Sequence, residues 1–440
     1  MSQYIPAVGI VGAGPSGCYL ADAINRKLPD GRIDIFDRLP TPFGLVRGGV
    51  APDHQGTKNI ARQFERTLGK PGVRFLGNVA IGRDIAYREL KTAYDVLVIT
   101  IGALQDRRLG IPGEDLDAVY GSGQFVAWYN GIPDGRDLDP RLDGKSIAII
   151  GNGNVALDIA RLLGKTPGEL ATSDLCAHAR AAFEAARIED IWLIGRRGPV
   201  EASFTTAELA EFGELSRVAV LVDPSQLPQA MPEGLGDEQR KLAEKNLEIL
   251  RAYAARGAQS ERPVRIHFMF NAAPLAIRGD GRVRELVLTH TRVEHGRPVP
   301  GGETFSIAAD TVVSAIGYRS TPFPELPFDA ARGTVANTQG RVEPGVYAAG
   351  WCKRGPQGVV PANRADSLAV ADLILADLAT CGASGKPGGA LIDSLLEERG
   401  IRPVGFSGWQ KINAAEIAAG QGRPREKLAR IEDLLTAAQG

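Results

Sequence analysis

The sequence predicts an α/β protein built from two doubly wound units, and two glycine-rich segments carry this prediction. The first, residues 12–17 (GAGPSG), directly follows the apolar run 8–11, and the second, residues 151–156 (GNGNVA), directly follows the apolar run 146–150. Each segment is typical of a strand, a tight turn and a helix, in which glycines let backbone N–H groups approach a pyrophosphate. We therefore expect two Rossmann-like dinucleotide-binding domains. The predicted contacts are Gly12, Gly14, Pro15, Ser16 and Gly17 in the first and Gly151 and Asn152 in the second.

The residues that follow the second strand differ between the two units. The predicted strand 33–36 ends in Asp37, 20 residues past Gly17, where a carboxylate can accept a hydrogen bond from a ribose 2′-hydroxyl. The predicted strand 191–194 ends instead in Arg196 and Arg197, and two guanidinium groups suit a 2′-phosphate. The second unit is therefore expected to bind NADP rather than NAD. A chain with both sites should pass a hydride between a nicotinamide and a second dinucleotide, for which FAD is the expectation.

The other elements of the two units follow in order along the chain. In the first unit we expect a helix over 17–28, a long ordered loop over 41–54, a helix over 57–68 and a buried strand over 95–103. In the second unit we expect a helix over 154–163, an extra helical stretch up to residue 187, a charged helix over 237–256, and strands over 264–270, 283–289 and 311–317. The strands 95–103 and 311–317 resemble each other, and we interpret them as the two crossings between domains.

After residue 317 the chain is expected to return to the first unit. A strand over 345–351 precedes Asn363, which is predicted to cap a helix with the apolar stripe Leu368, Ala371, Leu375 and Leu378. The predicted organisation is thus an NADP-binding domain, 105–317, inserted into an FAD-binding domain made of 1–104 and 318–440, the latter with a C-terminal extension.

Composition excludes several classes of protein. A net charge of −1 in 440 residues argues against nucleic acid as the main partner, and no run of eighteen apolar residues predicts a membrane span. The four cysteines form no Cys-x-x-Cys motif, which argues against a dithiol centre, a zinc ribbon or an iron–sulfur cluster within the chain, and no metal site is predicted. The first strand begins within a few residues of the N-terminus, so we expect no signal peptide and a cytoplasmic, reducing location.

Long motifs in the same order along nearly the whole chain resemble the adrenodoxin-reductase-type NADPH:ferredoxin reductases. They are the loop 42–54 (PFGLVRGGVAPDH), the segment 151–156 with Asp158, the segment 195–199 (GRRGP), the stretch 204–211, and Gly350-Trp351 with 353–356 and 358–359. Trp351 stands where many disulfide reductases carry Asp, and this departure and the absence of a redox cysteine pair argue against that branch of flavoproteins.

The resemblance implies roles for individual residues. FAD would be contacted by Gly44, Leu45, Val50, Gly102, Trp351, Gly358 and Val359, in addition to the first glycine turn and Asp37. NADP would be contacted by the backbone of Asn154 and Val155, by Arg196 and Arg197, and by Glu208 near the nicotinamide. His54 and Glu211 would form a polar pair near the contact between flavin and nicotinamide, and we list both as catalytic candidates.

The implied activity is that of an NADPH:ferredoxin oxidoreductase, in which a hydride passes from NADPH to N5 of FAD and electrons then pass singly to an iron–sulfur ferredoxin. The ferredoxin is expected to serve an oxidase such as a cytochrome P450, and the enzyme is expected to be a monomer. Two alternatives stay open at this point. One is an NADPH-dependent diaphorase or monooxygenase-like flavoprotein with a small-molecule acceptor, and the other is a non-catalytic electron-transfer or nucleotide-sensing subunit.

An acidic ferredoxin would need a basic surface. Lys58, Arg62 and Arg66 recur at helical spacing, and Arg240, Lys241, Lys245 and Arg251 lie on the predicted charged helix. Acidic residues are interspersed in both groups, so an ordinary solvated face is the alternative interpretation.

Overall fold

The computed structural model describes residues 5–257, 261–358, 360–381 and 385–440, and these residues form two compact units. Unit 1 comprises the chain up to Gln105, the short segment Asn130–Arg136, and the chain from Tyr318 onward. Unit 2 comprises Asp106–Tyr129 and Asp137–Gly317. The segment 130–136, which the sequence analysis placed in the middle domain, groups with unit 1. The assignment of one cofactor to each domain stays a prediction.

Unit 1 is built on a six-stranded sheet in the order β18-β19-β4-β1-β2-β3, parallel except for the β18–β19 pair. Its strands are β1 (Ala7–Val11), β2 (Arg32–Phe36), β3 (Val73–Leu76), β4 (Val96–Ile99), β18 (Arg341–Glu343) and β19 (Val346–Ala348). Every residue of β1 and β4 is buried, as expected for parallel strands that are covered on both faces. Residues from the end of the chain therefore complete a sheet that its beginning starts.

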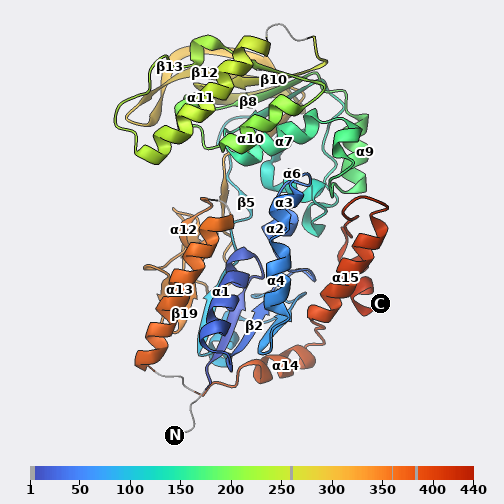
Figure 1. Cartoon of the computed structure of the whole chain (residues 1–440), viewed down its shortest axis with the longest axis vertical. Helices are drawn as coiled ribbons and strands as arrows, with labels where there is room; N and C mark the ends of the chain where they lie inside the picture. The colour runs from blue at the N-terminus through green and yellow to red at the C-terminus, as the bar shows by residue number, and fades with distance from the viewer. Residues whose placement is uncertain (1–4, 258–260, 359, 382–384) are drawn as a thin grey trace. The chain divides into compact units, whose positions relative to one another are not determined.

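Helices cover both faces of this sheet. They are α1 (Pro15–Lys27), α2 (Leu45–Gly48), α3 (Gln55–Lys58), α4 (Ala61–Leu68), α5 (Tyr87–Ala93), α12 (Trp351–Arg354), α13 (Val360–Cys381), α14 (Gly389–Glu398), α15 (Phe406–Ala419) and α16 (Ile431–Gln439). The long helix α13 packs against α1, so the returning segment lies beside the first glycine turn (Figure 1). Short elements complete the unit: η1 (Pro133–Gly135), β15 (Tyr318–Arg319), β16 (Phe328–Asp329) and β17 (Thr334–Val335).

Unit 2 repeats the doubly wound plan with a fully parallel sheet in the order β6-β14-β7-β8-β10-β9. Its strands are β6 (Val119–Gly121), β7 (Ser146–Ile150), β8 (Asp190–Ile194), β9 (Val218–Val222), β10 (Val264–Met269) and β14 (Thr311–Ser314). A separate antiparallel sheet joins β11 (Ala272–Asp280), β12 (Arg282–Glu294) and β13 (Arg297–Ala308). The strand β5 (Gln105–Asp106) marks the first boundary between the units along the chain.

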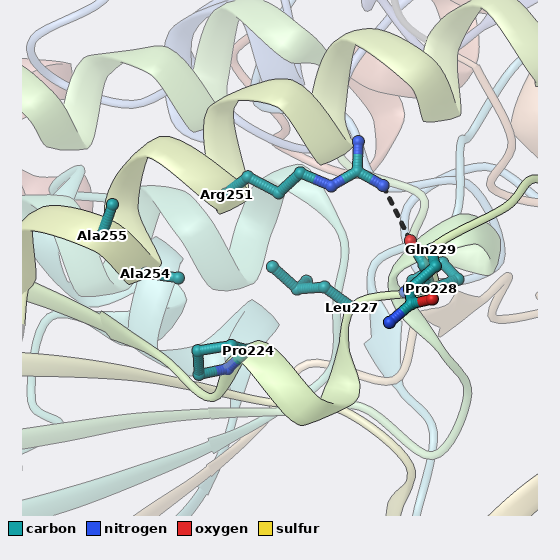
Figure 2. A pocket seen from close by; sticks show the side chains of 7 residues that line it. All are labelled: Pro224, Leu227, Pro228, Gln229, Arg251, Ala254 and Ala255. Atoms are coloured by element: carbon teal, nitrogen blue, oxygen red, sulfur yellow. Dashed lines mark hydrogen bonds between the residues drawn. The ribbon is translucent and has the colours of Figure 1, made fainter.

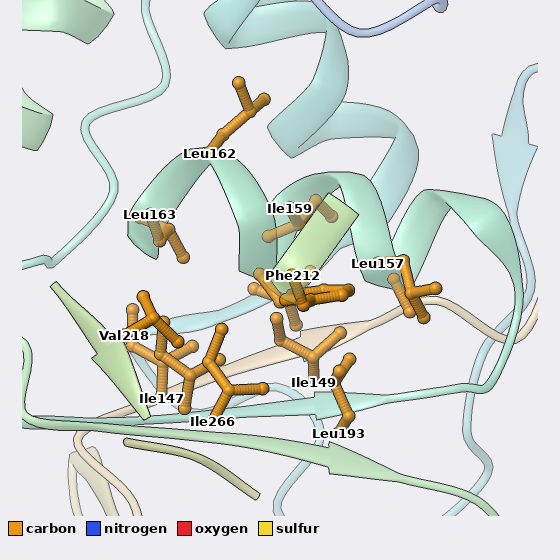
Figure 3. Packing of buried hydrophobic residues seen from close by; sticks show 14 of the residues in the cluster. Ile147, Ile149, Leu157, Ile159, Leu162, Leu163, Leu193, Phe212, Val218 and Ile266 are labelled. Atoms are coloured by element: carbon orange, nitrogen blue, oxygen red, sulfur yellow. The ribbon is translucent and has the colours of Figure 1, made fainter. Parts of the chain in front are cut away.

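The helices of unit 2 are α6 (Ser122–Tyr129), α7 (Asn154–Gly164), α8 (Pro167–Leu170), α9 (Ala177–Ala185), α10 (Thr206–Ala210) and α11 (Asp237–Gly257), with the short turns η2 (Pro199–Glu201), η3 (Glu211–Glu214) and η4 (Pro224–Gln226). Leu157 and Ile159 of α7, Phe212 of η3 and Ile149 of β7 belong to one hydrophobic core between the helix and the sheet, and each is fully buried (Figure 3). Burying one such side chain contributes about 1.5–3 kcal/mol. This packing holds the start of α7 at the carboxyl end of β7.

Several sequence predictions are confirmed by these elements, and those for the helix near Asn363 and for residues 57–68 differ from the structure. The strands that were predicted, together with α1, α7, α11 and the extra helices between α7 and β8, lie where they were expected. The helix predicted to begin at Asn363 begins instead at Val360, so Asn363 is not its cap. Pro361 accounts for the difference, because proline is favoured in the first turn of a helix and disfavoured farther inside. Asn363 accepts a hydrogen bond from Nη2 of Arg354 at 2.6 Å.

The predicted apolar stripe of α13 is also partly wrong. Leu368 is 43% exposed, whereas Ser367, Val370, Ala371 and Ile374 are buried. The buried face thus includes a serine, whose Oγ donates a hydrogen bond to the carbonyl of Ser16 at 3.1 Å. The helix predicted over 57–68 is divided into α3 and α4.

Two further observations concern the whole described chain. No helix in it combines the length and the apolar composition needed to cross a bilayer. Cys18, Cys176 and Cys352 are all buried and none forms a disulfide. Burial raises the pKa of Cys18 above its usual range and that of Cys352 to about 12.

Candidate functional site

The first glycine turn joins β1 to α1 in unit 1. Gly12 has φ +113°, and a Cβ there would lie 2.5 Å from the carbonyl oxygen of Thr100, so the turn itself requires this glycine. A Cβ at Gly14 would instead meet nothing closer than Cα of Gly44, at 3.9 Å. No side chain caps the N-terminus of α1 and its first turn holds no acidic residue. The space beside Gly14 is therefore open, and the helix N-terminus can receive an anion.

Asp37 lies directly after β2, where the sequence predicted a ribose contact. Its Oδ2 accepts a hydrogen bond from the backbone N–H of Ala13, and its Oδ1 one from that of Leu39, both at 3.0 Å. Burial raises the pKa of Asp37, and these two N–H groups oppose the rise. Because a carboxylate oxygen can accept more than one hydrogen bond, the carboxylate keeps capacity for a hydroxyl group. Asp37 is thus held against the first glycine turn by the protein itself.

The predicted FAD loop lies against the same turn. The backbone N–H of Phe43 donates to the carbonyl of Ala13 at 2.8 Å, and Phe43 and Gly44 both have positive φ, at 79° and 47°. Gly44 is the N-cap residue of α2, whose first residue Leu45 is half-buried, and Val50 donates its N–H to the carbonyl of Leu45. Phe43 and Gly44 thus lie against residues 13–14, and the FAD contacts of this loop stay predictions.

The returning segment supplies a further set of predicted residues to unit 1. A Cβ at Gly350 would lie 2.1 Å from Oγ of Ser16, and the Gly350 N–H donates to Asp366 at 2.6 Å. Gly102 has φ +71°, and a Cβ there would meet no protein atom within 4 Å, so open space lies beside it. Gly358 is exposed with φ +76°. Val359 lies outside the described residues.

Trp351 is the first residue of α12. Its indole Nε1 is buried and has no hydrogen-bond partner among the described residues. The ring stacks nearly parallel to that of Tyr318, with a centroid separation of 6.5 Å and an interplanar angle of 20°. A buried indole N–H normally finds an acceptor, so this donor is consistent with contact to a bound group that carries acceptors.

The second glycine turn joins β7 to α7 in unit 2. Gly151 has φ +143°, and a Cβ there would lie 2.2 Å from the carbonyl oxygen of Ala315. The N-terminus of α7 has no side-chain cap and no acid in its first turn, like that of α1. Oδ1 of Asn154 accepts the N–H of Thr205 at 2.8 Å, which holds the segment after η2 beside this turn. Val155 follows within the first turn of α7, so the four predicted contact positions of this segment lie together.

Asn152 was predicted to bind NADP, and its carbonyl accepts the backbone N–H of Ser203 at 2.9 Å. A Cβ at Gly195 would lie only 1.8 Å from Nδ2 of the Asn152 side chain. The amide therefore occupies the space that a side chain at 195 would need. Oδ1 of this amide is buried without a partner among the described residues. The glycine at 195 is thus needed to admit the amide, and the unpartnered oxygen can accept a donor from a ligand.

Arg196 and Arg197 follow β8 and both side chains are exposed. Their backbone is fixed, because the carbonyl of Arg197 accepts the N–H of Asn271 and that of Arg196 accepts the hydroxyl of Thr291. Among the described residues, neither guanidinium forms an ion pair with a carboxylate. Two guanidinium groups on a fixed turn at the carboxyl end of β8 suit a phosphate.

A buried arginine that the sequence analysis missed gathers two of the predicted residues. Arg161 of α7 is fully buried, and its guanidinium contacts Glu208 at 2.9 Å, Asp158 at 2.8 Å and Glu211 at 3.1 Å. Three carboxylates thus surround one cation in unit 2. The i,i+3 spacing of Asp158 and Arg161 is a signal that could have revealed it.

His54 lies in unit 1, half-buried at the end of the loop 42–54, and its N–H donates to the carbonyl of Ala51 at 3.0 Å. Its predicted pairing with Glu211 relates residues of different units and stays a prediction.

One pocket of about 350 Å³ was found apart from these residues. It lies in unit 2 between η4 and α11 and is lined by Pro224, Leu227, Pro228, Gln229, Arg251, Ala254 and Ala255 (Figure 2). Arg251 donates a hydrogen bond across it to the carbonyl of Pro228 at 2.7 Å. None of the predicted cofactor contacts lines this pocket.

The chain is similar to known proteins over nearly its whole length. The family model described as pyridine nucleotide-disulphide oxidoreductase matches residues 6–365. The chain belongs to this family. Within this pyridine nucleotide-disulphide oxidoreductase family, it is 40% identical to the NADPH-ferredoxin reductase FprA of Mycobacterium leprae, over all of this chain and 99% of that protein. It is 39% identical to human mitochondrial NADPH:adrenodoxin oxidoreductase, over 98% of this chain and 91% of that protein.

A solved structure, Mycobacterium tuberculosis FprA in complex with NADPH, matches the fold with a TM-score of 0.93 at 37% identity, over 99% of this chain and all of that one. The predicted fold class and the resemblance to adrenodoxin-reductase-type reductases are thereby confirmed. The roles of the individual site residues stay predictions.

Proposed function

We propose that this oxidoreductase is an NADPH:ferredoxin reductase with FAD as its resident cofactor. One observation carries the proposal: a single chain holds two helix N-termini without side-chain caps behind glycine turns, with a carboxylate after β2 and two exposed guanidinium groups after β8. These are the features that distinguish a site for an unphosphorylated ribose from one for a 2′-phosphate. Relatives named as NADPH-ferredoxin and NADPH:adrenodoxin reductases match the chain over nearly its full length.

The residues of unit 1 suit FAD. The N-terminus of α1 would hold its pyrophosphate beside Gly14, and Asp37 would accept a ribose hydroxyl. Trp351, Gly44, Leu45 and Val50 would contact the remainder of the cofactor, with Gly102 and Gly358 as close-approach positions. FAD, when bound, can accept two electrons as hydride and release them singly, which an iron–sulfur acceptor requires.

The residues of unit 2 suit NADP. The N-terminus of α7 and the backbone of Asn154 and Val155 would hold the pyrophosphate, and Arg196 and Arg197 the 2′-phosphate. Glu208 would lie toward the nicotinamide. His54 and Glu211 are proposed to hold a proton or an ordered water near the reacting rings. The Arg161 guanidinium, 3.1 Å from the Glu211 carboxylate, would orient that carboxylate.

The proposed electron acceptor is an acidic iron–sulfur ferredoxin. Arg62 and Arg66 on α4, and Lys241 and Lys245 on α11, are exposed and spaced at i,i+4. Such cations attract an acidic partner over about a Debye length. A cytochrome P450 as final oxidase, a monomeric state and a cytoplasmic location are also proposed.

The experiment is stopped-flow mixing of the purified holoprotein with NADPH and, separately, with NADH, followed by absorbance of the flavin. Rapid bleaching by NADPH and reoxidation by ferredoxin are expected. Turnover with dyes or quinones but no ferredoxin would favour a diaphorase, a persistent flavin hydroperoxide under oxygen would favour a monooxygenase, and no bleaching at all would favour a non-catalytic subunit.

A further inference from the structure

A buried ion pair links the loop 42–54 to the C-terminal extension of the chain. Nη1 of Arg47 donates to Oε2 of Glu416 at 2.8 Å, and Nη2 donates to Oε1 at 2.5 Å. The side chain of Arg47 is 7% exposed and that of Glu416 is fully buried. The two residues lie 369 positions apart in the chain, on α2 and α15. A bidentate pair of this geometry fixes both the distance and the orientation of its two side chains.

The chain also satisfies the remaining hydrogen-bonding capacity of Glu416. Its Oε1 accepts the backbone N–H of Leu428 at 2.9 Å, and Oε2 lies 3.4 Å from Nη1 of Arg425. Burial raises the pKa of Glu416, but the charge and hydrogen bonds of Arg47, with the other donors, outweigh burial and hold the pKa below its ordinary value. Glu416 is therefore an ionised, fully coordinated group and a rigid attachment point.

Arg47 in turn belongs to the turn that lies against the first glycine turn. Phe43 donates its N–H to the carbonyl of Ala13, and a Cβ at Gly44 would lie 3.0 Å from Cα of Gly14. Trp409 of α15 packs on both ends of this turn. The centroids of its ring and the Phe43 ring lie 5.4 Å apart in an edge-to-face arrangement. The guanidinium carbon of Arg47 lies 5.4 Å from the centroid of the Trp409 ring. The turn 43–48 is thus held between α15 and residues 13–14.

From these contacts we infer that Glu416 is a positioning residue for the flavin: through Arg47 it sets the backbone of residues 43–48 at the distance from Gly14 that FAD requires. This inference rests on the proposed function, since it needs FAD in unit 1. It assigns to the C-terminal extension a role in cofactor retention as well as in packing. The conformation of the turn includes two positive φ values, which a loose loop would not keep unaided.

The test is the variant Glu416→Gln, which keeps the size of the side chain and removes its charge. We expect the dissociation constant for FAD to rise about tenfold or more, because residues 43–48 would no longer be held at their distance from Gly14. The visible circular dichroism of the bound flavin should also change. Arg47→Lys keeps a charge but not the bidentate geometry and should change both readouts in the same direction. The double variant Arg47→Gln with Glu416→Gln should bind FAD about as tightly as whichever single variant binds it less tightly. The two losses should not add, because the two residues act as one unit.

Asp34→Asn is the matched control. It breaks another ion pair of unit 1, in which Nε of the partly exposed Arg74 lies 2.8 Å from the buried Asp34, outside residues 43–48. It should lower the melting temperature and leave FAD affinity and the flavin spectrum unchanged. If Glu416→Gln also lowers only the melting temperature, or affects flavin no more than Asp34→Asn does, the inference is overturned. If Glu416→Gln is not recovered folded, Arg47→Lys decides by the same criteria. A wild-type protein that binds no FAD would instead refute the proposed function.

Discussion

Gly14 and Gly44 face each other across the first glycine turn, and their surroundings are unequal. A Cβ at Gly44 would lie 3.0 Å from Cα of Gly14, whereas a Cβ at Gly14 would come no closer than 3.9 Å to any protein atom outside its neighbours. Gly14 also has φ −75°, which any residue can adopt. The folded chain therefore tolerates a larger residue at 14, and only a ligand in the open space would exclude it.

This difference predicts opposite outcomes for two substitutions in one motif. Gly14→Ala should change the free energy of unfolding of the apoprotein by less than about 1 kcal/mol, yet weaken FAD binding by a factor on the order of 100. Gly12→Ala should lower the free energy of unfolding by about 2–5 kcal/mol, because residue 12 has a positive φ and its new Cβ would collide with the carbonyl of Thr100. Denaturant unfolding and equilibrium dialysis with FAD measure the two effects. Wild-type affinity in Gly14→Ala would exclude a pyrophosphate from this turn.

The arginines after β8 predict the coenzyme preference. Replacing Arg196 and Arg197 together by Ala should remove two charge-assisted contacts to a 2′-phosphate, each about 1.5–3 kcal/mol, and so raise the KM for NADPH at least about 100-fold. The KM for NADH should change little, because NADH lacks that phosphate. Arg278→Ala, which removes another exposed arginine of unit 2, is the control. A preference for NADPH that survives the double variant would contradict the assignment.

The basic faces of α4 and α11 predict how the ferredoxin partner docks. Lys58 donates a hydrogen bond to Oδ1 of Asn130 at 3.4 Å, so a charge reversal at Lys58 would also disturb the packing of unit 1. Charge reversal at Arg62 and Arg66 is therefore the cleaner test of docking. Reversal of Arg62 and Arg66 to Glu, or of Lys241 and Lys245 to Glu, should lower the rate of ferredoxin reduction about tenfold or more at low salt. Reduction of a small dye should stay the same.

The control for these reversals is Arg32→Glu with Arg402→Glu, two exposed cations of unit 1 that lie outside α4 and α11. It carries the same change in net charge. An equal loss of ferredoxin reduction in this control, or an equal loss with dye and ferredoxin, would assign the effect to net charge or to the cofactors rather than to docking.

A histidine in unit 2 predicts a pH-dependent stability. His267 stacks on Trp192 at 3.9 Å, and its Nε2 lies 2.7 Å from Asp190. Burial lowers the pKa of His267 below its ordinary 6.5, and this outweighs the attraction of Asp190, which Arg265 also engages. The folded state therefore favours the neutral ring, and its contribution to stability is present above pH 6.5 and is lost as pH falls through the lower folded pKa.

We expect the melting temperature of unit 2 to decrease between about pH 7.5 and about pH 5.5, and the decrease to be smaller in His267→Gln. Asp190 does not confound this window, because its pKa is lowered from 3.8, chiefly by its hydrogen bonds to Arg265, and its contribution is lost only under more acidic conditions. An identical decrease in the variant would show that other groups cause it.

The sequence predicted those parts of the molecule that depend on local patterns. Each glycine turn, the strand before it and the helix after it lie within about thirty residues, so spacing alone identifies them. Asp37 and Arg196 were found for the same reason. The buried face of α13 was misjudged because Ser367 packs toward Ser16, and a search for apolar periodicity does not count a serine.

The contacts that join distant parts of the chain were not predictable in this way. Glu416 on α15 looks like any polar residue of an amphipathic helix, and only the folded chain brings it to Arg47. Arg161 was not predictable for the same reason. An arginine on a helix is ordinarily exposed, and the burial of this one depends on its ion pairs with Glu208 and Glu211, which lie about fifty residues farther along the chain.

The burial of the thiols gives the protein an internal reporter. Cys18 and Cys352 are protonated and shielded in unit 1, and Cys176 is shielded in unit 2, so alkylating reagents and peroxide should find no reactive thiolate at these positions while the chain is folded. Labelling at each of these cysteines therefore measures how often its own unit opens. Mass spectrometry of the modified peptides would then rank the two units by local stability without any engineered probe.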